Sequence, residues 1–275
     1  MNFRGRWVLI TGASSGLGRE IARCLARDHG ANLVLAARRV SRLEELKSDL
    51  QRTTGVSVHA IVADLSKAED VDRVFREATD GRSIYGVVLN AGVTHFGAFH
   101  ELSWADFQTM LATNVTSTVR LTTLFVPYLE ARDERGGLLL VSSMSGLTPI
   151  PYQAAYGGTK AFLINFGLGL QHEVGGKGVS ITVFAPGGIA TEMTAGERFG
   201  PLRSWLMPVE PCAQEAVRAF VQRRELHVPG FIYRLGSVLV RILPQRFVRS
   251  QISARYRNAL LKTARHSSGT SSLEV

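Results

Sequence analysis

Short apolar runs alternate with longer amphipathic segments through the first three quarters of the chain. The runs are rich in Val, Leu and Ile and occupy residues 7–11, 32–37, 56–63, 85–91, 137–143 and 179–186. Near-continuous apolar strands of this kind are typical of a parallel sheet that is buried on both faces. Between them, apolar residues recur at helical spacing in residues 18–30, 41–52, 66–79, 103–132 and 154–174. This order predicts an α/β fold with a doubly wound parallel sheet of about seven strands, the seventh near residues 225–229.

The length and composition favour a single globular unit. The chain has 275 residues, of which 45% are hydrophobic and 20% are charged, and this is enough to bury one large core. We expect residues 1–230 to form the domain and residues 231–265 to form a basic, partly apolar C-terminal extension. Residues 266–275, which include SSGTSS, are expected to be a disordered tail.

The two cysteines, Cys24 and Cys212, lie far apart and outside any Cys-x-x-Cys spacing. They predict neither a disulfide framework nor a metal site, and we expect both to be buried. The N-terminal stretch MNFRGRWVLITG leads directly into an apolar strand and lacks the long apolar core and cleavage site of a signal peptide. We therefore expect a cytoplasmic protein.

Positive charge is concentrated near the C-terminus. Residues 222–275 contain ten Arg or Lys and two Glu, a balance of +8, whereas the first 221 residues contain 22 basic and 21 acidic residues, a balance of +1. Attraction to anionic partners therefore belongs to the last fifth of the chain. Nucleic acid is a poor candidate for such a partner, because the basic residues are not interleaved with a recognised binding motif.

A glycine-rich turn, TGASSGLG at residues 11–18, follows the first apolar run and precedes a helical segment. Gly12, Gly16 and Gly18 would let the backbone approach a pyrophosphate, whose charge the N-terminus of the helix favours. The turn can also be no more than a tight connection. Because ligands of doubly wound sheets bind beyond the carboxyl ends of the strands, we favour a Rossmann-like dinucleotide site.

Two arginines, Arg38 and Arg39, follow the second apolar run. A site for NAD usually carries an acidic residue at this strand end, where it binds the ribose 2′-hydroxyl. Guanidinium groups suit a 2′-phosphate instead, so NADP is favoured over NAD. The alternative is that the two arginines only cap a surface loop.

Polar residues also follow the third and fourth runs. Asp64, with Leu65 after it, could bond an adenine amine, and the turn Asn90-Ala91-Gly92 could lie against a cofactor ribose. Each is ordinary turn chemistry when taken alone. Their weight comes from their position at consecutive strand ends.

Tyr156 and Lys160 stand four residues apart at the start of a helical segment and so share one helix face. A neighbouring ammonium stabilises a phenolate and lowers the pKa of the phenol from its usual value of about 10. Gly157 and Gly158, between them, each cost about 1 kcal/mol in a helix interior. We therefore expect the backbone here to lie close to a cofactor or to a partner subunit.

Taken in order, these motifs resemble the short-chain dehydrogenase/reductase family of the Tyr-Lys type. The matching residues are TGASSGLG, Asp64, NAG at 90–92, Asn114 in NVTS, Ser143, YGGTK at 156–160 and PGGIAT at 186–191, over about residues 5–230. The resemblance implies that residues 1–230 are an NADP-binding and catalytic domain. It also implies an oxidoreductase that transfers hydride between the nicotinamide and a carbonyl or alcohol.

The resemblance implies a role for each matching residue. Tyr156 would exchange a proton with the substrate oxygen and Ser143 would hold that oxygen. Lys160 would lower the pKa of Tyr156 and hold the nicotinamide ribose, and Asn114 would hold a water that links Lys160 to solvent. Ser142 is expected to make only a strand-end hydrogen bond. The implied cofactor-binding residues are Gly12, Ser14, Ser15, Gly16, Leu17, Gly18, Arg38, Arg39, Asp64, Leu65, Asn90, Ala91, Gly92, Tyr156, Lys160, Pro186, Gly187, Ile189 and Thr191.

The loops that would contact a substrate, residues 93–99, 147–152 and 193–208, are apolar. They favour a lipophilic ketone, a steroid or a 3-oxoacyl compound over a sugar. His95 could contact the substrate, but a lone histidine on a loop is more often solvated. A non-enzymatic NADP-binding scaffold or regulator is the alternative function, although such proteins typically lose the Tyr or the Lys.

Two kinds of macromolecular contact are also expected. The family usually forms homodimers or homotetramers through the segments 103–132 and 154–174, where Gly167 and Gly169 would permit close packing. The segment 231–247 is too short to span a bilayer. We expect it to cover the substrate cleft as a lid, with a peripheral membrane contact or an acyl-carrier docking surface as the alternatives.

Overall fold

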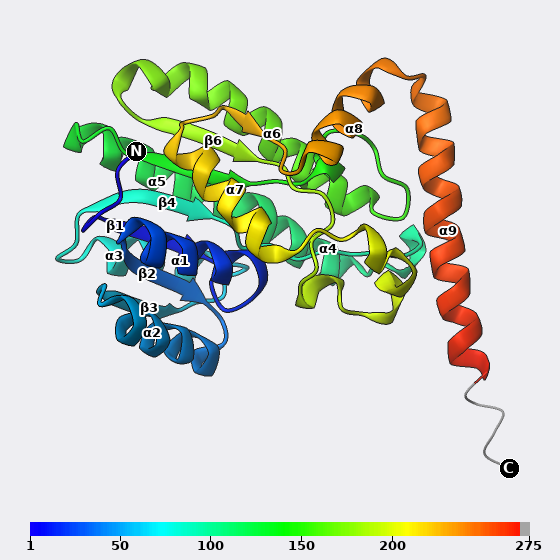
Figure 1. Ribbon diagram of the computed structural model, residues 1–275, viewed down its shortest axis with the longest axis horizontal. Coiled ribbons are helices and arrows are strands. Elements are labelled where there is room, and N and C mark those ends of the chain that lie inside the picture. Colours follow the sequence, from blue (N-terminus) through cyan, green and yellow to red (C-terminus); the bar gives the residue numbers. More distant parts are fainter. Residues whose placement is uncertain (270–275) are drawn as a thin grey trace, which may run out of the picture.

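The computed structural model describes residues 1–269, with the side chains of residues 238, 240–242, 245 and 262–269 left undescribed (Figure 1). Its centre is a parallel sheet in the order β3-β2-β1-β4-β5-β6-β7. The strands are β1 Trp7–Thr11, β2 Asn32–Ala37, β3 Val58–Val62, β4 Ile84–Leu89, β5 Gly137–Val141, β6 Ser180–Phe184 and β7 Leu226–His227. The predicted Rossmann-like sheet of seven strands is therefore confirmed.

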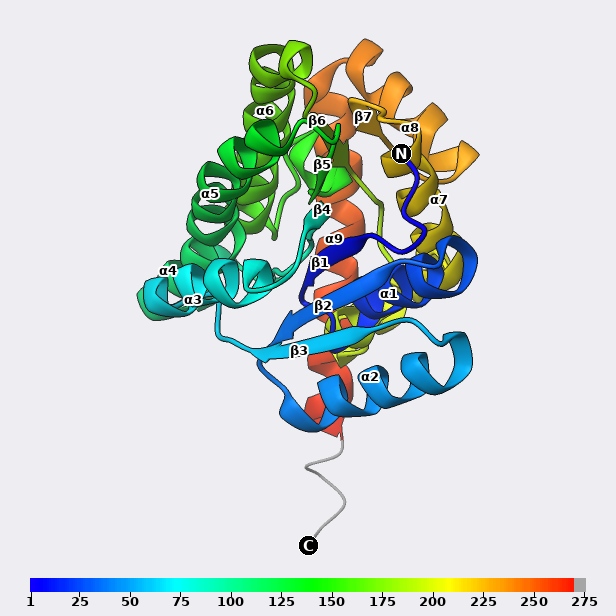
Figure 2. The same cartoon turned by 90° about the vertical axis from the view of Figure 1, so that its left-hand side faces the viewer.

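Helices cover both faces of the sheet (Figure 2). One face carries α1 Gly16–His29, α2 Val40–Thr54 and α7 Val209–Val221; the other carries α3 Ala68–Thr79, α5 Ser117–Arg132 and α6 Ala154–Val174. Within β1, Val8 and Ile10 pack in the first layer and Leu9 packs in the second. This alternation explains why the strands read as unbroken apolar runs, since side chains on both faces are buried.

The segment 103–132, predicted as one helix, is interrupted in the structure. The helix α4 Trp104–Leu111 and the helix α5 are joined by a π-helical turn, Ala112–Thr116. Such single turns occur frequently at functional sites. Here the turn carries Asn114, which is fully buried.

Gly167 was expected to permit close packing at a partner subunit. A Cβ at Gly167 would instead lie 2.5 Å from Val183 Cγ2 and 2.9 Å from Leu140 Cδ1, within the same chain. The absent side chain therefore lets α6 lie close to its own sheet, and that part of the prediction is wrong. A Cβ at Gly169 would meet no heavy atom within 4 Å.

The C-terminal extension forms two helices, α8 Phe231–Ile242 and α9 Gln245–Gly269. Helix α9 crosses the carboxyl edge of the sheet, at the end to which the strand arrows point (Figures 1 and 2). It includes residues 266–269, which were predicted to be part of a disordered tail, because no Pro or Gly interrupts residues 246–268. Residues 270–275 lie outside the described residues. Within the described part of the chain, none of the helices is both long and apolar enough to cross a membrane.

Candidate active site

A cavity of about 870 Å³ opens at the carboxyl edge of the sheet. Every residue predicted to bind cofactor or to act in catalysis lines it, except Gly18 and Asn114. Residues from six strand ends and from the C-terminal extension therefore meet in one space, as the topology of a doubly wound sheet requires.

The glycine turn after β1 is packed too closely for side chains. Gly12 and Gly16 have φ values of +67° and +52°, in the left-handed region that glycine adopts without strain. A Cβ at Gly12 would lie 2.9 Å from Ala91 Cα, and a Cβ at Gly18 would lie 2.5 Å from the carbonyl oxygen of Gly12. The turn leads into the N-terminus of α1, so its backbone N–H groups and the helix dipole fit a pyrophosphate.

Thr11, at the end of β1, ties the glycine turn to the turn after β4. Its hydroxyl oxygen accepts hydrogen bonds from the backbone N–H groups of Asn90, at 3.0 Å, and Ala91, at 3.1 Å. The Asn90 amide in turn donates to the carbonyl oxygen of Thr11, at 3.0 Å. Thr11 was not among the predicted site residues, although a polar residue that closes an apolar run was a usable signal.

The two arginines after β2 lie in different surroundings. Arg38 is exposed and lines the cavity. Arg39 donates from Nε and Nη2 to the Ser14 hydroxyl, at 3.2 and 3.1 Å, and its Nη1 lies 2.6 Å from a carboxylate oxygen of Glu192. The Arg39 guanidinium holds the pKa of Glu192 below its usual value. Arg39 therefore joins the nucleotide end of the cavity to the loop after β6, a contact between residues 153 positions apart that the sequence did not predict.

Asp64, after β3, is partly engaged in its own turn. Its Oδ1 accepts from the backbone N–H and the hydroxyl of Ser66, at 3.1 and 2.9 Å. Its own backbone N–H donates to Asp70 Oδ2, at 2.7 Å. The adjacent Leu65 is buried against the cavity. The contacts fix the position of the Asp64 carboxylate at the cavity wall.

Ser143, Tyr156 and Lys160 come together beyond β5 at the start of α6. The Lys160 Nζ lies 5.7 Å from the centre of the Tyr156 ring and donates to the carbonyl oxygen of Val141, at 2.9 Å. Ser143 caps a short 3₁₀ turn, and its hydroxyl oxygen accepts from the backbone N–H of Ser145, at 3.1 Å. The arrangement places a hydroxyl, a phenol and an ammonium at one end of the cavity.

Burial dominates the protonation of this group. It raises the pKa of Tyr156 to about 12, against a smaller lowering by the Ser143 hydroxyl, and it lowers the pKa of Lys160 to about 8. The direction for Tyr156 is the opposite of the expected one. Lys160 directs its ammonium to the carbonyl of Val141, and the desolvation of the phenol outweighs any gain from the nearby charge. The phenol therefore keeps its proton at neutral pH.

Ser142 makes the strand-end hydrogen bonds that were expected of it. Its backbone N–H donates to the carbonyl oxygen of Phe184, at 2.7 Å, and its hydroxyl donates to the carbonyl oxygen of Lys160, at 2.7 Å. Ser142 thus links β5 to β6 and to α6, which holds Lys160 in place.

Asn114 supports the group of Ser143, Tyr156 and Lys160 through hydrogen bonds to the neighbouring segments. Its Oδ1 accepts from the backbone N–H of Val93, at 2.8 Å, and its Nδ2 donates to the Val93 carbonyl oxygen and to the Thr159 hydroxyl, at 2.9 and 3.0 Å. The side chain therefore joins the loop after β4 to α6, next to Lys160. Its predicted contact with a water stays a prediction.

The loop after β6, residues 186–191, lines the cavity and lies against the glycine turn. A Cβ at Gly16 would lie 3.2 Å from Thr191 Cβ, and a Cβ at Gly187 would lie 2.7 Å from the ring of Tyr233, on α8. The Tyr233 hydroxyl donates to the carbonyl oxygen of Trp205. Glycine at 187 therefore makes room for a side chain from the C-terminal extension.

Helix α9 forms the roof over the catalytic end of the cavity. Ile252, Arg255 and Tyr256 line the cavity from this helix. The Tyr256 ring packs edge-on against Phe96, at 5.2 Å between ring centres, and the Arg255 guanidinium lies 4.6 Å from the centre of the Trp205 ring. No sequence motif marks these residues, so they were not predicted to belong to the site.

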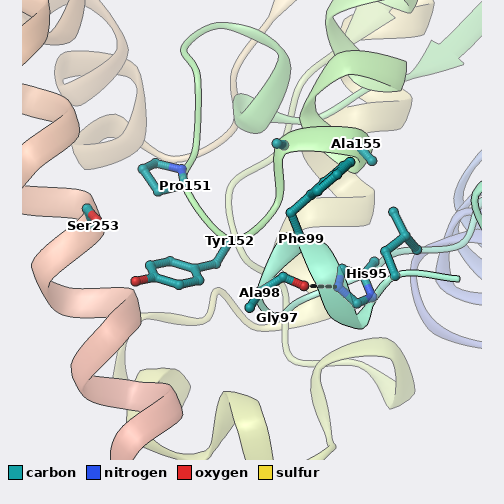
Figure 3. A pocket seen from close by; sticks show the side chains of 10 residues that line it. His95, Gly97, Ala98, Phe99, Pro151, Tyr152, Ala155 and Ser253 are labelled. Atoms are coloured by element: carbon teal, nitrogen blue, oxygen red, sulfur yellow. Dashed lines mark hydrogen bonds between the residues drawn. The ribbon is translucent and has the colours of Figure 1, made fainter.

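A second, smaller cavity of about 270 Å³ also lies against α9, beside Ser253 (Figure 3). It is bounded by the loop 95–102, the loop 151–155 and Ser253 of α9. His95 lines this cavity rather than the main one, and its Nε2 lies 3.4 Å from the carbonyl oxygen of Ala98. His95 therefore lies apart from Tyr156, which lines the main cavity.

The glycine cradle, the polar strand ends and the two arginines together fit a dinucleotide. Comparison with known proteins agrees. A family model described as "short chain dehydrogenase" matches residues 6–200. The chain is similar, with 30% identity and a TM-score of 0.76 over 82% of this chain and 88% of the other, to a short-chain dehydrogenase from Sphingobium yanoikuyae that was solved in complex with NADPH.

Two curated relatives show how far the similarity reaches. The mouse (Mus musculus) 17-beta-hydroxysteroid dehydrogenase type 3 is 35% identical over 192 residues, which is 69% of this chain and 62% of the relative. The "inactive hydroxysteroid dehydrogenase-like protein 1" of Pongo abelii is 32% identical over 206 residues, 74% of this chain and 62% of the relative. The chain thus matches about three fifths of the length of these relatives.

Proposed function

The chain belongs to the short-chain dehydrogenase family, and on that basis we propose that it is an NADP(H)-dependent oxidoreductase acting on a lipophilic carbonyl or alcohol. One observation carries the proposal: Ser143, Tyr156 and Lys160 line the same cavity as the glycine turn and the two arginines. A proton donor and a dinucleotide cradle are thus brought to one space. Nothing else in the cavity offers a comparable set of reactive groups among the described residues.

The residues divide the work of the reaction. The nicotinamide, when bound, supplies or accepts a hydride. In the reducing direction the Tyr156 phenol, which is protonated at neutral pH and whose pKa burial raises to about 12, donates its proton to the carbonyl oxygen. The Ser143 hydroxyl holds the same oxygen by a hydrogen bond. The Lys160 ammonium provides positive charge beside the phenolate that remains, and it would hold the nicotinamide ribose when the cofactor is bound.

The preference for NADP is proposed from the charge at the end of β2. Arg38 and Arg39 line the part of the cavity where a 2′-phosphate would bind. A guanidinium forms strong charge-assisted hydrogen bonds with phosphate. Ser14 holds the Arg39 guanidinium from the glycine turn. The relative that is described with NADPH supports the same choice.

The substrate class is proposed from the lining of the catalytic end. Apolar residues from separate segments, Ile150, Met193, Phe199, Leu202, Trp205 and Ile252, surround the space beyond Tyr156. A hydrophobic wall of this size suits a bulky ketone, a steroid or a 3-oxoacyl chain. The steroid alternative is supported by the name of the mouse relative.

A homodimer or homotetramer is part of the same proposal, assembled through α4, α5 and α6. Large apolar side chains remain exposed on these helices, notably Trp104, Leu111 and Phe162. The ring of Phe162 stacks on Phe166, at 5.7 Å, which forms a flat apolar surface.

We also propose a cytoplasmic location in which the protein can reach a membrane surface.

The test is NADPH oxidation with ketosteroids, 3-oxoacyl thioesters, retinal and aromatic ketones, repeated with NADH. The Tyr156→Phe variant should lose turnover on every active substrate while it binds NADPH nearly as well as the wild type. Full activity in that variant would refute the assignment of Tyr156. Equal use of NADH would refute the role of Arg38 and Arg39.

A non-enzymatic cofactor-binding protein is the second candidate, because one relative is named inactive. The complete set of Ser143, Tyr156 and Lys160 favours the enzyme. NADPH binding without turnover of any compound in the panel would favour the second candidate instead.

A further inference from the structure

Helix α8 carries an apolar face that is turned to solvent, so the prediction that this face covers the substrate cleft as a lid is wrong. Phe231 is 76% exposed, Ile232 81%, Leu235 50% and Leu239 46%, and Leu243, which follows the helix, is 42% exposed. At about 100° per residue, these positions fall within a single sector of about 120°. We refer to these five residues as the α8 face. An amphipathic helix normally turns such a face to the core, so its exposure indicates a partner.

The opposite side of α8 fixes this orientation. The Tyr233 ring lies against Gly187, and its hydroxyl donates to the carbonyl oxygen of Trp205. Glu215 of α7 accepts from the backbone N–H of Gly230, at 2.9 Å, and pairs with Arg234, at 3.3 Å. Turning the α8 face inward would break all of these contacts. The face is therefore held outward by the fold itself.

The charge around the α8 face selects the kind of partner. Residues 222–275 carry a balance of +8. Just beyond the face, Phe247 is 56% exposed and stands between the exposed Arg246 and Arg249. A second copy that docked through the same face would bring two positive segments together, because such a contact is isologous. An anionic lipid surface offers the opposite charge and an apolar layer beneath it.

We infer that the α8 face, together with Phe247, docks the protein on the surface of an anionic membrane. The apolar side chains enter the boundary between headgroups and acyl chains, and the neighbouring arginines pair with lipid phosphates. In this arrangement α8 lies on the membrane, and its 12 residues are too few to cross it.

This position has a consequence for the substrate, which rests on the proposed function. Tyr233, on the inner side of α8, lines the main cavity. The bilayer surface and the cavity wall are therefore separated by one helix, about 10 Å thick. A lipophilic carbonyl compound dissolved in the membrane would reach the cavity without crossing bulk water.

The test is co-sedimentation of the full chain with vesicles of phosphatidylcholine alone or mixed with phosphatidylglycerol. We expect binding to the mixed vesicles, weaker binding to the neutral ones, and a loss of binding as salt is raised. The double variant Ile232→Ser, Leu235→Ser should bind the mixed vesicles at least tenfold more weakly. Leu261→Ser, which changes a 53% exposed leucine on α9, is the matched control and should bind as the wild type does.

Two further measurements keep the outcomes distinct. Light scattering reports the oligomeric state, and turnover of a water-soluble ketone reports the active site without lipid. Undiminished vesicle binding by the double variant, or no binding of the wild type, would overturn the inference. Loss of self-association in place of vesicle binding would identify a second copy as the occupant and would also overturn it. Since neither Ile232 nor Leu235 lines the cavity, turnover should stay unchanged, and failure of turnover in the wild type would count only against the proposed function.

Discussion

Gly157 and Gly158 are neighbours in α6, yet an added methyl group would meet different surroundings at each. A Cβ at Gly157 would lie 2.9 Å from the carbonyl oxygen of Ser145, whereas a Cβ at Gly158 would have no heavy atom within 4 Å. Gly157 is buried and Gly158 is exposed. Gly157→Ala and Gly158→Ala are therefore a matched pair, one directed at the turn that carries Ser143 and one directed at solvent.

The expected difference between the two variants comes from packing alone. Each replacement gains about 1 kcal/mol of helix propensity, and this gain cancels in the comparison. The obstacle at Gly157 is a backbone carbonyl, and overpacking of this kind costs about 1–3 kcal/mol. Gly158→Ala should raise the free energy of unfolding by up to about 1 kcal/mol. Gly157→Ala should be less stable than Gly158→Ala by about 1–3 kcal/mol.

The same displacement should reach the chemistry. Because Ser143 and Ser145 belong to one short turn, moving the Ser145 carbonyl shifts the Ser143 hydroxyl, and small shifts of catalytic groups reduce kcat by about tenfold to hundredfold. Denaturant unfolding and NADPH oxidation measure the two effects. Equal stability and equal kcat in the two variants would refute the reasoning. A loss of oligomer in Gly158→Ala would show that a partner subunit covers Gly158 and would contradict its assignment to solvent.

Three further predictions concern single contacts. Lys160→Met should change the pH dependence of stability: the pKa of Lys160 is lowered from 10.5 to about 8, so the folded protein loses this proton before the unfolded chain does. The free energy of unfolding of the wild type should therefore rise by about 3 kcal/mol relative to that of the variant as the pH rises from 8 to 10.5. If denaturant unfolding shows the same difference between the two proteins at both pH values, the lowered pKa of Lys160 is contradicted. Glu192→Gln removes the ionic partner of Arg39. Calorimetry should therefore show that the variant binds NADPH about two- to fivefold more tightly and binds NADH with unchanged affinity. An equal gain in affinity for both cofactors would mean that the Glu192 carboxylate does not compete with the 2′-phosphate for Arg39. Tyr256→Ala should raise KM for a bulky ketone by about tenfold, whereas Tyr256→Phe should leave KM nearly unchanged. If both variants raise KM equally, the hydroxyl of Tyr256 and not its ring contacts the substrate.

The sheet could be predicted from the sequence because a strand that is buried on both faces appears in the sequence as an unbroken run of apolar residues. The inner strands of the sheet had to be apolar at successive positions, as Val8, Leu9 and Ile10 illustrate. The location of the site followed from the same topology, since the carboxyl ends of parallel strands share one edge. The π-helical turn at Asn114 left no such trace, because one extra residue in a turn barely alters the apolar spacing.

The parts of the site that escaped prediction depend on contacts between distant segments. The ion pair of Arg39 and Glu192 joins residues that follow β2 and β6. Nothing in the sequence near either residue indicates that the two side chains pair. The pKa of Tyr156 depends on how deeply α6 and α9 bury it, which the Tyr-Lys spacing alone does not contain. The exposure of the α8 face likewise follows from how Tyr233 and Glu215 anchor the helix.

Helix α9 has a bearing on how such a protein changes its substrate. The residues that match the family model end at 200, whereas the roof of the cavity is built from Ile252, Arg255 and Tyr256. Ser143, Tyr156, Lys160 and the glycine turn thus belong to the part of the chain that matches the family, and the α9 wall of the cavity belongs to a separate part. If the proposed function holds, we expect that substrate specificity can be altered by exchanging α9 while Ser143, Tyr156 and Lys160 stay unchanged.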